Sequence, residues 1–189
     1  MKRIGIYYAT RTGHTQLIAE HVAIILQQRG FDAELRNLHG HDGSPSLKDC
    51  AGVILAASVH MGKHEPEMVD FATKHRAELD ALPSLFLSVS LSEVGAERAT
   101  ATAKEHERYA ADVQGMIDGF VAETGWHPAR VKPVAGALMY SKYNLLVRFI
   151  MKRIAKRERA DTDTSRDYEY TDWNSLDRVV EEFAANIAG

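Results

Sequence analysis

Short apolar segments alternate with segments whose apolar residues recur at helical spacing, and this alternation limits the chain to few folds. Residues 51–58 are almost wholly apolar and small, as in a strand buried on both faces of a parallel sheet. Further strands are expected at 4–9, 31–38, 85–90 and 131–138, and helices after residue 14, after Pro66, from Ala103 to Glu123 and from about Thr171 or Asp172. Right-handed crossovers then predict an α/β fold, a doubly wound five-stranded parallel sheet with strand order 2-1-3-4-5.

The chain of 189 residues has the length and the apolar content, 45%, of one globular domain, so we interpret residues 1–189 as a single domain. Pro133 predicts an edge position for the last strand. Residues 139–170 fit neither a strand nor a crossover helix, and we interpret them as an insertion after strand 5. The single cysteine, Cys50, cannot form an internal disulfide, and no apolar stretch is long enough to span a bilayer.

A threonine-rich loop joins the first expected strand to the first expected helix. This threonine loop consists of Thr10, Arg11, Thr12, Gly13, His14 and Thr15. Backbone N–H groups are unpaired at the start of a helix, where the helix dipole also favours an anion. Three threonine hydroxyls can add donors, and Gly13 permits a positive φ. The loop therefore predicts a phosphate site, although threonine and glycine also occur in ordinary helix caps.

Several other activities lack their sequence pattern. The threonine loop has neither the second glycine of a dinucleotide fingerprint nor the Gly-Lys-Ser/Thr of a Walker loop, which disfavours NAD and ATP. His60 and His64 are four residues apart, and His39, His41 and Asp42 share a segment. No zinc-ligand pattern connects them, so we expect no metal site. No spacing supports a hydrolytic triad.

A basic segment lies inside the insertion. Residues 142–159 hold seven basic side chains and one acidic one, a net charge of +6, so the rest of a chain with charge −3 carries −9. Apolar residues at helical spacing are Leu145, Leu146, Phe149, Ile150 and Ile154, and the basic residues expected on another face are Arg148, Lys152, Lys156 and Arg159. Such a helix suits an anionic membrane surface. The residues alone support equally a helix packed on its own domain, whereas the acidic remainder disfavours nucleic acid.

The threonine loop, in the pattern T-x-T-G-x-T after a first strand, resembles the loop that binds the phosphate of flavin mononucleotide (FMN) in the flavodoxin family. That resemblance implies FMN as the cofactor and a flavodoxin-like fold. It also implies that two loops enclose the flavin ring, namely Ser58, Val59, His60, Met61 and Gly62, and Ser88, Val89, Ser90 and Leu91. Neither loop holds an aromatic residue, so His60, Met61 or Tyr140 would have to cover a face of the ring.

Motifs along nearly the whole chain resemble the menaquinone-dependent protoporphyrinogen oxidase family. These are Ala-Ser-x-x-x-Gly at 57–62, Ala-Gly-Ala-Leu-x-Tyr at 135–140, Arg-Phe-Ile-Met-Lys at 148–152, Thr-Asp-Thr at 162–164 and Tyr-Thr-Asp-Trp at 170–173. The resemblance implies an enzyme of haem biosynthesis that dehydrogenates protoporphyrinogen IX to protoporphyrin IX and passes electrons to a membrane quinone. The flavin carries the redox chemistry, so no catalytic side chain is assigned.

Substrate and membrane contacts are expected in the insertion, at Tyr140, Arg148, Lys152, Arg153 and Lys156. Expected partners are protoporphyrinogen IX, menaquinone or ubiquinone, and an anionic membrane, at the cytoplasmic face of the cell membrane. Homo-oligomerisation is left open. A flavodoxin-type electron carrier, an FMN-dependent quinone reductase and a non-catalytic membrane-surface module are the alternatives. A plain electron carrier needs no cationic arm, and the module needs no threonine loop.

Overall fold

The computed structural model describes residues 1–39, 47–157 and 160–188. Its main sheet has five parallel strands in the order β2-β1-β3-β5-β6, which confirms the predicted fold class and strand order. The strands are β1 (Arg3–Ala9), β2 (Asp32–Asn37), β3 (Cys50–His60), β5 (Ser84–Ser90) and β6 (Arg130–Ala135). Strand β6 forms an edge, as Pro133 predicted, because proline cannot donate to a further strand.

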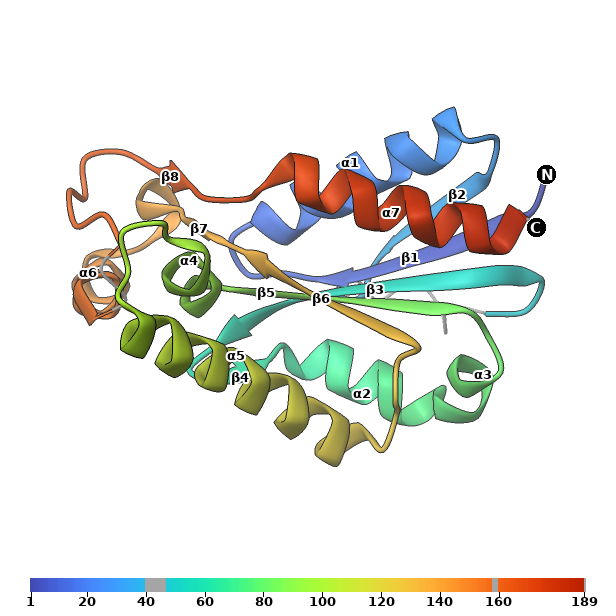
Figure 1. The fold of residues 1–189 in the computed structure, drawn as a ribbon, viewed down its shortest axis with the longest axis horizontal. Coiled ribbons are helices and arrows are strands. Elements are labelled where there is room, and N and C mark those ends of the chain that lie inside the picture. Colours follow the sequence, from blue (N-terminus) through green and yellow to red (C-terminus); the bar gives the residue numbers. More distant parts are fainter. Residues whose placement is uncertain (40–46, 158–159, 189) are drawn as a thin grey trace.

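Two helix layers cover the sheet, one on each face (Figure 1). Because side chains alternate along a strand, Ile4, Ile6 and Tyr8 pack on one face and Tyr7 and Ala9 on the other. The first face is covered by α1 (His14–Gln28) and α7 (Trp173–Ala188), and the second by α2 (Pro66–Lys74), α3 (Arg76–Asp80) and α5 (Ala103–Thr124). The carboxyl ends of the strands therefore meet at one end of a closed core.

Three predicted elements differ from the structure. Strand β3 continues to His60, because its last residues pair with the short antiparallel strand β4 (Lys63–His64). The helix expected from Pro66 towards Leu79 is two helices, α2 and α3, separated at His75. The strand expected over 131–138 divides at Gly136 into β6 and β7 (Ala137–Leu138), because β7 leaves the main sheet and pairs with β8 (Tyr168–Glu169).

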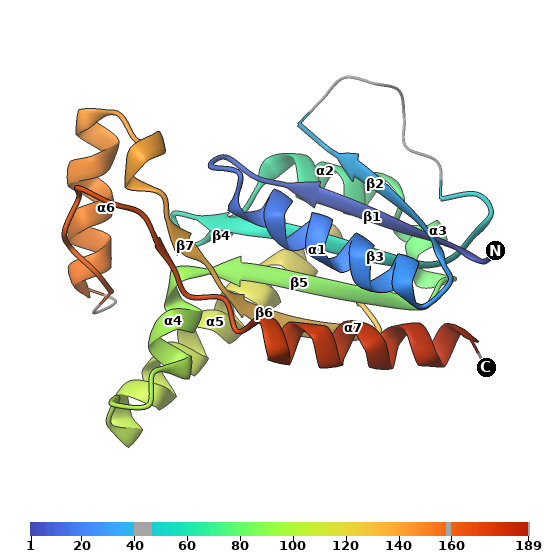
Figure 2. The ribbon, with the colours of Figure 1, turned by 90° about the horizontal axis from the view of Figure 1, so that it is seen from above.

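The insertion forms a small unit of its own at the end of the molecule opposite the two termini (Figure 2). Its further elements are a 3₁₀ turn, η1 (Tyr140–Lys142), and helix α6 (Leu145–Arg157). Leu138, Tyr140, Met151 and Ala155 are buried together there, and Leu91 of helix α4 (Leu91–Glu97) packs against them. The strands point towards this unit (Figure 2), so the insertion faces the edge where a doubly wound sheet binds its ligand.

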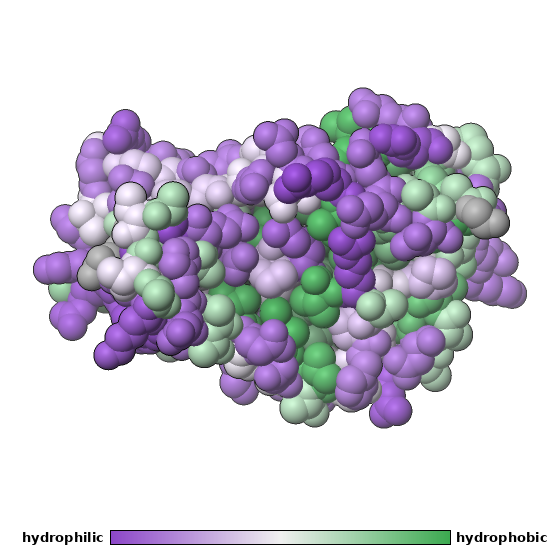
Figure 3. Space-filling model, viewed as in Figure 1, coloured by the Kyte–Doolittle hydropathy of each residue, from purple (hydrophilic) through white to green (hydrophobic). Residues whose placement is uncertain are grey.

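The surface in Figure 3 is hydrophilic over both helix layers, and hydrophobic residues gather in a band between them. Large apolar residues that stay exposed include four on α6, namely Leu145, Leu146, Phe149 and Ile150. Among the described residues, none of the helices has both the length and the apolar character required to traverse a bilayer.

Candidate functional site

The threonine loop connects β1 to α1 and is shaped by Gly13. Gly13 is the residue that precedes α1, and its φ of 90° lies in the left-handed region. A Cβ atom at Gly13 would meet nothing within 4 Å, so backbone conformation and not crowding selects glycine. The hydroxyl of Thr10 accepts a hydrogen bond of 3.1 Å from the Gly13 N–H. The Thr10 side chain therefore stabilises the turn of the loop.

The N-terminus of α1 offers its donors to an anion. In the described part of the chain no side chain caps this end, and the first turn holds no acidic residue. The first N–H groups of a helix lack partners within the helix, and its dipole favours negative charge. Thr12 and Thr15 line the pocket in front of this end. These residues fit a phosphate group, as the sequence predicted.

His14 connects the threonine loop to the start of α7. Its Nε2 lies 2.8 Å from the Thr171 hydroxyl, which itself donates to the Ala135 carbonyl oxygen at 2.8 Å. The hydroxyl hydrogen is thus used, so Nε2 is the donor to Thr171. Burial lowers the pKa of His14, which keeps the ring neutral. His14 lines the pocket, but its engaged nitrogen positions the loop. The neighbouring Asp172, whose carboxylate accepts the Ser175 N–H at 3.0 Å, caps α7.

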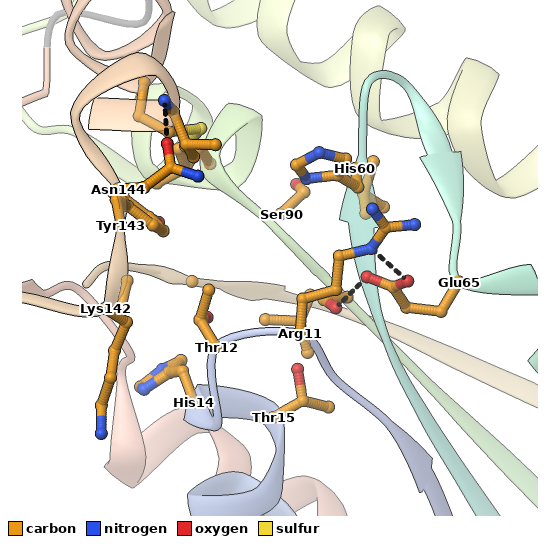
Figure 4. A pocket seen from close by; sticks show the side chains of 18 residues that line it. Arg11, Thr12, His14, Thr15, His60, Glu65, Ser90, Lys142, Tyr143 and Asn144 are labelled. Carbon is orange, nitrogen blue, oxygen red and sulfur yellow. Dashed lines mark hydrogen bonds and ion pairs between the residues drawn. The ribbon is translucent and has the colours of Figure 1, made fainter. Parts of the chain in front are cut away.

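Arg11 reaches across the pocket to a buried carboxylate that sequence reasoning missed (Figure 4). Its Nε lies 2.8 Å from Glu65 Oε2, and the Ser58 hydroxyl donates to Glu65 Oε1 at 2.9 Å. Only 3% of the Glu65 side chain is exposed. A buried carboxylate needs such partners, so Glu65 fixes Arg11 and Ser58 relative to each other. The position of Glu65, directly before the helix-opening Pro66, was the available signal.

The two segments expected as ring loops are ends of strands in the structure. Ser58, Val59 and His60 belong to β3, and Met61 and Gly62, with φ of 52° and 80°, form the turn to β4. Ser88, Val89 and Ser90 belong to β5, and Leu91 begins α4. Pairing with β4 extends β3 beyond its expected end at residue 58, whereas β5 ends at Ser90 as expected.

The side chain of Ser88 is directed away from the pocket. It is buried and lies 2.9 Å from Nε2 of His64, which packs between Phe86 and Phe120. Burial lowers the pKa of His64 to about 4, so this histidine is neutral. Ser88 and His64 therefore hold the β3–β4 hairpin on the sheet, and the Ser88 side chain does not line the pocket in front of the threonine loop.

The threonine loop, the strand ends and the insertion line one pocket of about 280 Å³, which we call the loop pocket. Arg11, Thr12, His14 and Thr15 line it from the loop, and Ser58, Val59, His60, Val89, Ser90 and Leu91 line it from the strand ends. The insertion contributes Lys142, Tyr143, Asn144, Val147 and Met151. Figure 4 shows residues of these three regions around the same space. The structure thus brings the threonine loop, the strand ends and the insertion to one space.

Comparisons with known proteins show the family of this chain. The sequence model described as the flavodoxin domain matches residues 5–165. Protoporphyrinogen IX dehydrogenase (quinone) of Escherichia coli strain K12 is 31% identical over 179 residues, 95% of this chain and 93% of that protein. The protein of the same name from Leishmania major is 32% identical over 181 residues, 94% of this chain and 73% of its own length. The chain belongs to this flavodoxin-type dehydrogenase family.

Solved flavodoxin structures support the fold. A short-chain flavodoxin associated with a PDU bacterial microcompartment has a TM-score of 0.54 at 15% identity, and a flavodoxin from the domain Archaea has 0.53 at 11%; each comparison covers 99% of both chains. Membership of the flavodoxin-type dehydrogenase family makes the chain an oxidoreductase, and it supports FMN as the cofactor expected from the threonine loop.

Arg148 and Tyr140 bond within the insertion, which differs from the contacts expected of them. Arg148 is half-buried, and its Nη2 donates to the carbonyl oxygens of Tyr140 and Tyr143 at 3.1 and 3.5 Å. Tyr140 is fully buried and its hydroxyl donates to the Asp161 carbonyl oxygen at 2.8 Å. Arg148 therefore holds the start of α6, and Tyr140 cannot cover a flavin face because it belongs to the core of the insertion.

The other expected basic residues lie on the surface. Lys152, Arg153 and Lys156 are exposed, as a membrane-facing role requires, and Arg159 lies outside the described residues. The described part of the chain contains no group of three or more metal-ligating His, Cys, Asp or Glu residues, and His41 and Asp42 lie outside that part. The expectation that no metal binds stays a prediction.

Proposed function

We propose that the chain uses FMN to oxidise protoporphyrinogen IX to protoporphyrin IX, a step of haem biosynthesis, and passes the electrons to a quinone. The names of the relatives from Escherichia coli and Leishmania major support this substrate and this acceptor. The balanced reaction consumes three quinones, because the porphyrinogen loses six electrons and six protons and each quinone takes up two of both. In this proposal residues 1–189 act as one domain.

The observation that carries the proposal is the shared lining of the loop pocket. A plain electron carrier needs the threonine loop and the strand ends, but here Lys142, Tyr143, Asn144, Val147 and Met151 add a wall from the insertion. That wall gives a substrate a surface beside the cofactor. Two cationic side chains, Arg11 and Lys142, line the loop pocket against one carboxylate, Glu65. The resulting positive charge suits ligands that carry phosphate or carboxylate groups.

Residues of the loop pocket divide into those that would hold FMN and those that would shape its surroundings. The α1 amides with the hydroxyls of Thr12 and Thr15 suit the phosphate, and residues 58–60 and 90–91 suit the ring. FMN, when bound, supplies the electron-accepting chemistry. Val59, Val89 and Val147 give apolar walls that exclude water. Burial raises the pKa of Tyr143, so its hydroxyl keeps its proton and stays a hydrogen-bond donor.

The test is an anaerobic assay of the FMN-loaded protein. Protoporphyrinogen IX is supplied with a menaquinone or ubiquinone analogue, and newly formed protoporphyrin is followed by its fluorescence. We expect a rate that depends on both protein and acceptor. The control is the Gly13→Val variant, which we expect to lack FMN. A parent protein that gives no acceptor-dependent gain over the uncatalysed rate, while its bound FMN can still be reduced, would favour an electron carrier.

We also propose that α6 docks on an anionic membrane surface, at the cytoplasmic face of the cell membrane. Leu145, Leu146 and Phe149 are 83%, 70% and 61% exposed, and Lys152 and Arg153 are exposed on the same helix. Exposed apolar side chains are normal singly, but a cluster on one short helix is a candidate contact surface. Apolar insertion and attraction of cations to anionic lipid would act together there.

A further inference from the structure

A second pocket lies beside the loop pocket, between the β3–β4 turn and α6. It has a volume of about 520 Å³. The side chains that give it its character are Leu91, Met61, Met116, Met151 and Ile154. We call it the methionine pocket. Its volume falls within the range of about 300–1,000 Å³ that small-molecule sites occupy.

The chemistry of the methionine pocket suits a flat, uncharged ligand. Thioether side chains are flexible and polarisable, and they adapt to apolar and aromatic surfaces. Asp112 and Arg157 are its only lining carboxylate and cation from the described residues, and their charges cancel. His60, Ser90 and Ser92 supply a few polar groups that can bond to carbonyl oxygens. The loop pocket, with Arg11 and Lys142 against Glu65, instead favours anions.

The two pockets share a wall. Five residues line both of them, namely Val59, His60, Ser90, Leu91 and Met151. These residues stand at the carboxyl ends of β3 and β5, at the start of α4 and on α6. A ligand in the methionine pocket would therefore lie next to whatever fills the loop pocket, which is the arrangement that transfer of electrons from one ligand to the next requires.

Helix α6 carries residues of both the methionine pocket and the apolar surface patch. Met151 and Ile154 line the pocket, and the same helix carries the exposed residues Leu146 and Phe149. A lipid-soluble ligand that arrives at the patch would meet the pocket on the same helix. A water-soluble, anionic ligand would gain nothing from this route.

We propose that the methionine pocket is the quinone site, and that porphyrinogen and quinone use neighbouring pockets that share one wall. This assignment deepens the proposed function and rests on it for the identity of the acceptor. The occupant is the quinone ring with the first part of its side chain, because the pocket has apolar side chains, balanced charges, a few polar groups and a wall in common with the loop pocket.

The test is a substitution of a residue that lines the methionine pocket but not the loop pocket. Met116 on α5 lines only the methionine pocket, and Met116→Trp should reduce its free volume. Gln114→Trp is the matched control, because Gln114 is exposed on the same helix and lines neither pocket. A second variant, Met116→Lys, places a charge at the same position without the bulk of an indole.

Two measurements on the FMN-loaded proteins decide the assignment. The first is the binding of menadione, a soluble naphthoquinone, by calorimetry in the absence of porphyrinogen. We expect about tenfold weaker binding in Met116→Trp and Met116→Lys and unchanged binding in Gln114→Trp. The second is porphyrinogen oxidation with menadione or with ferricyanide, a small anion that needs no apolar site. We expect KM for menadione to rise and the ferricyanide rate to stay unchanged.

Menadione binding that is equal in the parent and in both Met116 variants, with FMN content unchanged, would overturn the assignment. Equal losses with menadione and ferricyanide would also overturn it, because the defect would then lie in the loop pocket. If the parent binds menadione through Met116 but oxidises no porphyrinogen with either acceptor, the quinone site stands and the proposed substrate fails. Circular dichroism and FMN content establish that each variant is folded.

Discussion

The threonine loop and helix α6 face the same pocket, but their structures are determined in different ways. The turn of the loop is determined within a few residues of the chain, because Thr10 bonds to Gly13 and Gly13 precedes α1. Among the described residues, only the side chains of Arg11 and His14 in the loop bond to distant residues, Glu65 and Thr171. In α6, the orientation of the helix depends on Tyr140, Tyr143 and the other residues of the insertion core. The local sequence was therefore enough to predict the turn of the loop, but it did not predict the orientation of the helix.

The reason is that α6 has apolar residues on more than one side. Met151 and Ala155 are buried, whereas Leu145, Leu146 and Phe149 are exposed. A spacing of three and four residues predicts an amphipathic helix but does not say which of two apolar stripes packs inward. The partners of α6 come from β7 and η1, which precede it in the sequence, and from β8, which follows it, so the spacing within the helix does not indicate them.

Gly13→Val should give the largest effect on FMN affinity, and it tests whether the turn at Gly13 determines the cofactor site. Strain of about 1–3 kcal/mol at a left-handed residue adds to the loss of amide contacts worth about 0.5–1.5 kcal/mol each. We therefore expect FMN affinity to fall at least about a hundredfold. The measurement is a titration of the FMN-free protein, followed by the quenching of FMN fluorescence.

The matched control is Gly30→Val. Gly30 follows the other end of α1, has φ of 84° and also has space for a Cβ atom. It should lose stability through the same strain and keep its FMN affinity. Equal FMN affinities in Gly13→Val and the parent would remove the threonine loop from the cofactor site.

The exposed stripe of α6 should give the next largest effect. Leu146→Gln with Phe149→Gln should weaken binding to anionic vesicles by about tenfold or more, because burial of one such side chain contributes about 1.5–3 kcal/mol. Lys152→Gln with Arg153→Gln should weaken it by at most about 1 kcal/mol per charge, and only at low salt. Sedimentation with vesicles measures both. Unchanged sedimentation in the first variant, with a change in oligomeric mass, would assign the stripe to a second copy of the chain.

Much of the fold followed from the sequence because strand and helix periods are local. The five parallel strands, their order and the edge position of Pro133 agree with the prediction. The division at Gly136 did not follow, because it depends on pairing of β7 with the distant β8. Ser88 and Tyr140 were misplaced for a related reason. A polar or aromatic residue beside a site is equally able to bond inward, as both do here.

Arg148 tests whether its inward orientation stabilises the insertion. Its Nη2 bonds to two carbonyl oxygens, while its Nε has no partner among the described residues. Arg148→Met should therefore destabilise the insertion by about 1–3 kcal/mol, and Arg153→Met, an exposed control, by less than about 0.5 kcal/mol. Hydrogen exchange of the α6 amides measures the difference. Equal protection in the two variants would show that α6 is held by its apolar contacts alone.

Glu93 lies two residues after Leu91 on α4, at the end of the sheet that faces the insertion, and should give an effect that appears only as the pH rises. Burial, then repulsion by Glu97, raises the pKa of Glu93 to about 7, while Lys132 opposes the shift. Because the folded pKa lies above the ordinary value of 4.5, the folded state binds the proton more tightly. This contribution to stability is present below pH 4.5 and is lost as the pH rises towards and through 7. Glu93→Gln should thus match the parent near pH 4 and be more stable by up to about 3 kcal/mol at pH 8, since glutamine cannot ionise. Urea unfolding at both pH values measures this difference, with the exposed Glu107→Gln on α5 as the control.

Hydrogen exchange at the same pH values shows how far the change extends. Protection that changes in α4 alone keeps the sheet and the insertion independent, whereas protection that changes in α6 as well means that the two regions respond to one proton together.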